Sequence, residues 1–163
     1  MFTTISDCPD ATESTVWTSS TGILAPQYQN LNDGDTLEVT AFSISRELLG
    51  GIEASLVAAG ATETAEASGA MVAWVFDSAG NPISGATVSC EGCGTFYYFD
   101  QDSADGLFTT GGELNAGTDA SGMVMLLAPP TSNYSAAADG YEFDGFLFGG
   151  TAGIATFAAF YAK

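Results

Sequence analysis

The chain has 163 residues, enough for one domain of ordinary size with its own core. It carries 20 acidic residues, 2 basic residues and no histidine, which gives a formal net charge of −18. This balance argues against nucleic-acid binding, because almost nothing could neutralise phosphates, and against docking on anionic membranes. It permits cation binding or life in high salt, where screening relieves self-repulsion.

Only 13% of the residues are charged, while 46% are apolar. Soluble domains average about a quarter charged residues. Two explanations stay open: Ser, Thr, Gly and Asn cover much of the surface, or neighbouring subunits bury it. We find no stretch near the roughly 20 consecutive apolar residues of a membrane span, and the N-terminus lacks the regions of a signal peptide.

The first third of the chain has weak signals. Residues 1–36 lack helical periodicity and are typical of short strands joined by loops, residues 32–35 indicate a turn, and alternation over 36–44 predicts a strand. Residues 45–59 fit a helix with an apolar stripe, or two strands that meet at a Gly-Gly pair. The small, acidic segment 60–69 separates an extension (1–69) from a domain (70–163), either as an exposed linker or as a long loop.

From residue 70 onward, β-rich runs alternate with turn residues. They predict strands at 71–76, 83–90, 95–99, 107–110, 123–128, 133–138, 142–148 and 153–161. Short strands at this spacing predict an all-β sandwich rather than βαβ units. The last strand is apolar on both faces, which predicts burial on both sides. It is a central strand of the domain, or a strand packed against or lent to a neighbouring subunit.

Three turn-forming stretches carry a resemblance to a known family: DSAGNPISGATV (77–88), TDASG (118–122) and ADGY (138–141). With them, residues 70–163 resemble the transthyretin-like, carboxypeptidase-regulatory-like β-sandwich domain. The resemblance implies a Greek-key sandwich whose glycines satisfy turn geometry and whose alternating apolar residues face the core. It also implies a non-catalytic module of secreted or cell-surface proteins, and it assigns no catalytic residues.

Cys90 and Cys93 form a CxxC motif. A zinc site would need four Cys or His ligands, and the chain has three cysteines and no histidine. A thioredoxin-like pair would need a helix N-terminus, whereas the glycines and aromatic residues around this motif predict a turn between strands. Such a turn brings residues i and i+3 to about 5–6 Å, so we predict a structural disulfide. Cys8 is then free or bonded to another chain.

Asp100, Asp102 and Asp105 lie in a short loop that ends in Gly106. Asp-rich loops can supply the oxygen ligands that calcium prefers, although this spacing is not that of an EF-hand and the closing Glu is absent. A calcium site and a solvated acidic loop both remain open. Aromatic residues at 96–99, 143–148 and 157–161 fit core packing or, alternatively, a sugar-binding or interface stripe.

Catalysis finds little support, since the chain lacks a histidine base and its serines have no partner base. The sequence predicts a non-enzymatic, secreted or cell-surface β-sandwich that assembles with copies of itself into a filament or surface layer. A calcium-dependent adhesion or glycan-binding module is the alternative. Asn133-Tyr134-Ser135 matches the N-glycosylation acceptor pattern, which is common by chance.

Overall fold

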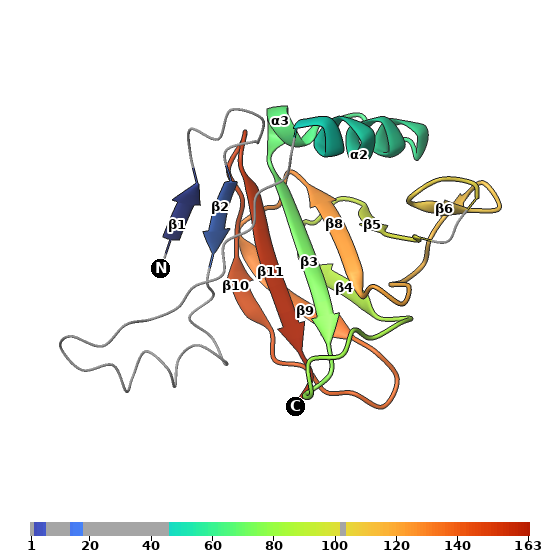
Figure 1. The fold of residues 1–163 in the computed structure, drawn as a ribbon. Coiled ribbons are helices and arrows are strands. Elements are labelled where there is room, and N and C mark those ends of the chain that lie inside the picture. Colours follow the sequence, from blue (N-terminus) through green and yellow to red (C-terminus); the bar gives the residue numbers. More distant parts are fainter. Residues whose placement is uncertain (1, 6–13, 18–45, 102–103) are drawn as a thin grey trace.

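A computed structural model describes residues 2–5, 14–17, 46–101 and 104–163, with side chains from residue 47 onward (Figure 1). The predicted turn at 32–35 and strand at 36–44, as well as Cys8 and Asp102, lie outside the described residues. The described helices and strands are β1 (Phe2–Ile5), β2 (Ser14–Trp17), α2 (Arg46–Ala58), α3 (Ala65–Ser68), β3 (Ala70–Phe76), β4 (Thr87–Cys90), β5 (Phe96–Tyr98), β6 (Thr109–Thr110), β7 (Glu113–Leu114), β8 (Met123–Leu127), β9 (Ser132–Ala137), β10 (Phe146–Phe148) and β11 (Ala155–Tyr161).

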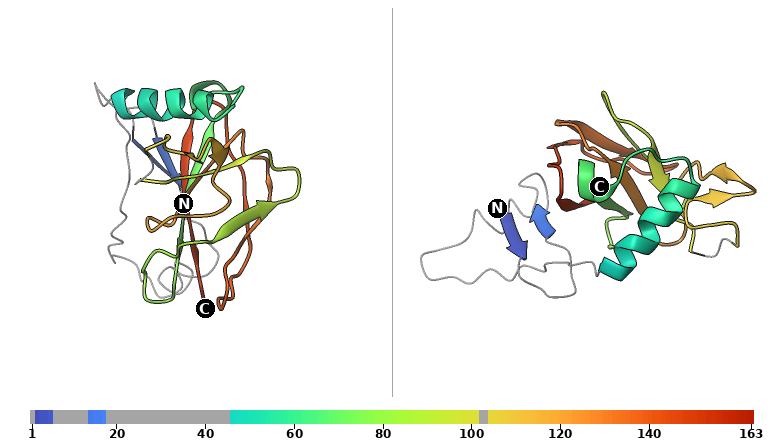
Figure 2. Two further views of the ribbon diagram at one scale, coloured as in Figure 1. Left: turned by 90° about the vertical axis from the view of Figure 1, so that its right-hand side faces the viewer. Right: turned by 90° about the horizontal axis from the view of Figure 1, so that it is seen from above.

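The strands form two main sheets that face each other (Figures 1 and 2). The large sheet has the order β1-β2-β11-β3-β8-β5, and the small sheet has the order β10-β9-β4. β11 runs parallel to both β2 and β3, while the other pairs are antiparallel. The all-β prediction is therefore confirmed only as a β-rich, sandwich-like fold with mixed pairing and with helices.

Apolar residues line both faces of the large sheet. Between the sheets lies the inner core, made of the buried side chains Met71, Ala73, Val75, Ile83, Ala86, Val88, Tyr98, Val124, Leu126, Tyr134, Phe146, Phe148, Phe160 and Ala162. On the opposite face lies the outer core, made of Ile52, Leu56, Ala65, Ala70, Val72, Tyr97, Phe99, Phe108, Met125, Leu127 and Phe157. β11 contributes to both cores, which agrees with a central strand buried on both sides.

Helix α2 settles the two interpretations of residues 45–59 in favour of a helix. Ile52 and Leu56 are buried in the outer core, and burying each such side chain contributes about 1.5–3 kcal/mol. This gain exceeds the helix penalty of Gly50 and Gly51, about 1 kcal/mol each. The helix crosses the α3 end of the outer face and leaves the opposite end uncovered (Figures 1 and 2). Within the described ranges, no helix is long and apolar enough to cross a membrane.

Several predicted strands are shorter in the structure. The strand predicted at 83–90 begins only at Thr87, because Gly85 adopts a left-handed φ of 77° in the preceding turn. The strand predicted at 142–148 begins at Phe146. The strand predicted at 107–110 is the two-residue β6, which pairs with β7 in a short hairpin. Segment 60–69 contains helix α3, and Ala65 packs in the outer core.

Hydrogen bonds link the two sheets at both sides of the sandwich. The amide of Val88 in β4 donates to the Tyr98 hydroxyl of β5 at 2.9 Å, and that hydroxyl donates to the Val88 carbonyl at 3.4 Å. On the other side, Phe143 pairs with Ala162, and the amide of Lys163 donates to the Glu142 carbonyl at 2.9 Å. These hydrogen bonds satisfy backbone amides and carbonyls near the sheet edges that could otherwise pair with strands of other chains.

Candidate functional site

The first two turn stretches meet at one point, which we call the turn junction. Thr118 is 4% exposed, and its hydroxyl donates to the Ile83 carbonyl at 2.6 Å. The same hydroxyl accepts from the Ala86 amide at 2.9 Å, while the Thr118 carbonyl accepts from the Gly85 amide at 2.6 Å. These bonds tie segment 83–86 to the loop before β8. The turn junction therefore has a structural role that the sequence pattern did not reveal.

Two carboxylates of these stretches organise their own loops. Asp77 accepts hydrogen bonds from the Ala79 amide, the Asn81 amide and the Asn81 side chain at 2.8–2.9 Å, and the bonds from Asn81 lower the pKa of the Asp77 carboxyl. Burial alone would raise the pKa of the Asp119 carboxyl. Hydrogen bonds from Ser121 and Gln101 together outweigh burial, so the pKa of this carboxyl lies below its ordinary value. Both carboxylates act as turn-forming acceptors.

We expect Asp77→Asn to change the acid dependence of stability. The pKa of this group is lower in the folded chain than its ordinary value of 3.8, so its stabilising contribution is complete above that value and is lost as the pH falls through the folded pKa. The gap in melting temperature between wild type and Asp77→Asn should close between about pH 5 and about pH 2. Thermal unfolding across that range checks this; a constant gap would contradict the role of the ionised carboxylate.

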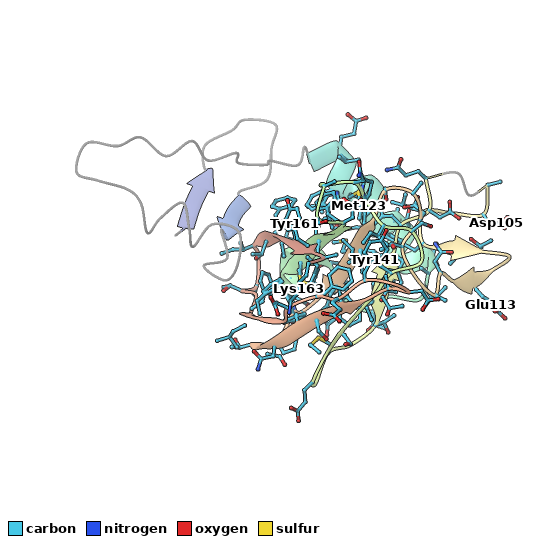
Figure 3. All side chains as sticks on the ribbon, turned by 90° about the horizontal axis from the view of Figure 1, so that it is seen from below. Asp105, Glu113, Met123, Tyr141, Tyr161 and Lys163 are labelled. Atoms are coloured by element: carbon cyan, nitrogen blue, oxygen red, sulfur yellow. A yellow bond between two sulfur atoms is a disulfide. The ribbon has the colours of Figure 1, made fainter. Side chains whose placement is uncertain are left out.

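The predicted calcium ligands contact their own hairpin. The Thr110 hydroxyl donates to Asp100 Oδ2 at 3.0 Å, and the Gly111 amide donates to Asp105 Oδ2 at 2.9 Å. Asp105 and Glu113 lie at the β6–β7 end of the molecule (Figure 3). In the ranges that the structure describes, which leave out Asp102, no three carboxylate, Cys or His groups are placed to hold a metal ion. Asp100, Glu113 and Asp119 line an open depression of about 350 Å³.

Cys90 and Cys93 are joined in a disulfide, with their Cα atoms 5.5 Å apart. Cys90 is the last residue of β4, and Cys93 lies just before β5. Both side chains are half-buried and pack against the inner core. The bond therefore staples the turn that carries the chain from the small sheet to the large one, close to the Tyr98–Val88 contact.

The uncovered end of the large sheet carries an apolar surface, which we call the outer strip: Trp74, Phe76, Met123, Ala159 and Tyr161. The rings of Phe76 and Tyr161 lie 5.2 Å apart as neighbours on β3 and β11, and Tyr161 is 40% exposed. Figure 3 shows Tyr161 on β11 and, separately, Tyr141 in the turn between β9 and β10. Strand alternation predicted these aromatic residues on strands, but their exposure depends on tertiary structure: among the described helices, α2 does not reach this part of the face.

The comparisons with known proteins identify no relative: no family model, no curated protein and no solved structure matches this chain. Four places in the structure bear on function: the turn junction, the disulfide, the acidic depression and the outer strip. The turn junction and the disulfide hold the fold together. Among the described residues, the outer strip and the acidic depression are two surfaces that could contact another molecule.

Proposed function

We propose that this protein is a non-enzymatic, extracellular structural subunit that assembles with copies of itself through the outer strip. The observation that carries the proposal is an aromatic sheet face without charge on a highly acidic chain. The outward residues of β3 and β11 are all uncharged: Ala70, Val72, Trp74, Phe76, Ala155, Phe157, Ala159 and Tyr161. Exposed apolar surface enriched in aromatic residues is typical of interfaces.

Charge favours contact at this face. Each copy carries a formal charge of −18, so copies repel wherever their carboxylates approach one another. A contact through the outer strip brings no carboxylate of β3 or β11 against the partner. The same patch can serve on both copies, as in a two-fold interface, and further surfaces would extend the assembly into a filament or layer.

The proposal includes the architecture of residues 70–163 as a transthyretin-like, carboxypeptidase-regulatory-like Greek-key module. Its support is that all three stretches form turns. In 77–81 the Asn81 amide donates to the Asp77 carboxylate, and in 118–122 the Thr118 hydroxyl accepts from the Ala86 amide. In 138–141 the Tyr141 amide donates to the Ala138 carbonyl at 3.2 Å. Modules of this kind serve adhesion or assembly, which agrees with a structural subunit.

Substitution of the exposed ring in the outer strip should weaken assembly. We expect wild type to sediment as oligomers in high salt, and Tyr161→Ser to shift the midpoint of association to at least tenfold higher protein concentration, about 1.4 kcal/mol of contact energy. Tyr141→Ser is the matched control, because Tyr141 is 44% exposed but lies outside the outer strip. Sedimentation velocity over a concentration series measures both. Equal behaviour of the two variants would remove the outer strip as the interface.

A calcium-dependent adhesion or glycan-binding module is the second candidate. Its support is the acidic lining of one depression by Asp100, Glu113 and Asp119, which can attract a cation although these three groups do not form a three-ligand site among the described residues. Calcium at about 100 times its dissociation constant would stabilise the fold by about 2.7 kcal/mol. A calcium titration of the melting temperature should then show a rise that Asp100→Asn reduces. An unchanged melting temperature in wild type would eliminate this candidate.

A further inference from the structure

The outward face of the small sheet is a second uncharged face on this acidic chain, and unlike the outer strip it is mainly polar. Side chains alternate along its strands, and the outward residues are all exposed and uncharged: Thr87, Ser89, Asn133, Ser135, Ala137 and Leu147. Their inward neighbours, such as Tyr134, Phe146 and Phe148, belong to the inner core. The face is therefore a mainly polar, uncharged surface with one large apolar side chain on it.

That apolar side chain is Leu147, which is 67% exposed. It is the register partner of Asn133 on the neighbouring strand. Directly opposed residues of an antiparallel pair have Cβ atoms about 4.5–5.5 Å apart on the same face. A group attached to the Asn133 side chain would therefore lie over Leu147.

Asn133 begins the sequence Asn133-Tyr134-Ser135, which is the only Asn-X-Ser or Asn-X-Thr in the 163 residues. The strand presents its two functional side chains outward, while Tyr134 between them is fully buried. Ser135 Oγ lies 3.2 Å from Ser89 Oγ on β4. Among the described residues, the side-chain amide of Asn133 makes no hydrogen bond, so its Nδ2 is available at the surface.

We propose that Asn133 carries an N-linked oligosaccharide that covers Leu147. The donor is a sugar chain activated as a polyprenyl pyrophosphate. A bond forms between Asn133 Nδ2 and the anomeric carbon, the bond from that carbon to the pyrophosphate oxygen breaks, the amide nitrogen loses one proton, and the lipid pyrophosphate leaves. The Ser135 hydroxyl completes the acceptor pattern.

The neutral face suits a bound sugar chain physically. Hydroxyls of Thr87, Ser89 and Ser135 can exchange hydrogen bonds with sugar hydroxyls, and the carbon–hydrogen face of a sugar ring can cover the Leu147 side chain. The outer strip lies on the other sheet, so glycosylation leaves the proposed assembly face open (Figure 2). The proposal requires only the extracellular location from the proposed function, not self-assembly.

Mass spectrometry of the protein purified from the cells that make it tests this site. Trypsin is unsuitable because Arg46 and Lys163 are the only basic residues, but cleavage after Glu113 and Glu142 releases residues 114–142 with Asn133 inside. We expect this peptide to carry hexose or N-acetylhexosamine mass, and we expect enzymatic removal of the glycan to convert Asn133 to Asp. Recovery of the unmodified peptide alone from secreted protein would overturn the glycan and leave self-assembly untouched.

Three variants made in the same cells separate the acceptor pattern from other causes of mass change. Asn133→Gln and Ser135→Ala should lose the added mass completely, whereas Ser135→Thr should keep it, because a hydroxyl remains two residues after the acceptor. Loss of the glycan should also increase retention on a hydrophobic column by exposing Leu147. Leu147→Ser in the Asn133→Gln background should reverse that increase. Added mass that survives in Asn133→Gln would contradict the assignment.

Discussion

Gly122→Ala is expected to lower the free energy of unfolding by about 2–4 kcal/mol. Gly122 has a φ of 68°, and an added Cβ would lie 2.7 Å from the Val75 carbonyl oxygen and 2.9 Å from Pro82 Cβ. Neither neighbour can move easily, since Val75 is in β3 and Pro82 pairs with Phe76. The substitution therefore combines backbone strain with a steric clash between the two turn stretches.

Gly140→Ala separates these two contributions. Gly140 has a similar φ of 81°, but an added Cβ would meet no atom within 4 Å. We expect it to lose only the backbone term, about 1–2 kcal/mol. Urea unfolding of both variants measures the difference, and equal losses would contradict the close contact of Gly122 with Val75 and Pro82.

The second large effect is a pair of Thr→Val substitutions with opposite signs. Thr118→Val leaves the Ile83 carbonyl and the Ala86 amide without their partner at a buried site. Unsatisfied buried groups cost about 1–3 kcal/mol each, so we expect a loss of about 2–4 kcal/mol. Chemical unfolding measures this loss. Because Val and Thr have nearly the same shape, the difference in free energy of unfolding reports the missing hydrogen bonds rather than a change in packing.

Thr156→Val is the matched variant. Thr156 is fully buried on β11, and its hydroxyl has no hydrogen-bond partner among the described residues. Replacing that hydroxyl by a methyl group removes a desolvation penalty, so we expect stability to rise by about 1 kcal/mol. If both variants destabilise by the same amount, the hydrogen bonds of Thr118 do not explain its loss.

Much of the fold could be predicted from local pattern. β3, β8, β9 and β11 follow from alternation bounded by turn residues. The two-sided apolar character of β11 correctly indicated burial of Phe157 and Phe160 on opposite faces, but Tyr161 at its end is 40% exposed. The helix and the strand starts were harder, because tertiary contacts decide them. Ile52 and Leu56 favour a helix only once the outer core exists, and the start of β4 depends on the turn at Gly85.

The candidate sites were predictable only in part. The spacing of Cys90 and Cys93 suits the short turn in which the structure places them. The acidic loop was identified from its carboxylates, but their hydrogen bonds to Thr110 and Gly111 depend on the β6–β7 hairpin, of which the sequence analysis predicted only the first strand. The outer strip depends on where α2 stops covering the sheet, and the neutral face of the small sheet depends on register; neither can be read from local sequence.

The most direct test of the central proposal is the mass of wild-type particles by light scattering over a series of protein and salt concentrations. Salt near 1 M shortens the screening length to about 3 Å, against about 30 Å at 0.01 M. If the outer strip joins copies of this acidic chain, the measured mass should rise well above the monomer mass of 16.6 kDa as salt and protein concentration increase. A mass that stays at that of the monomer throughout the series would contradict the proposed function.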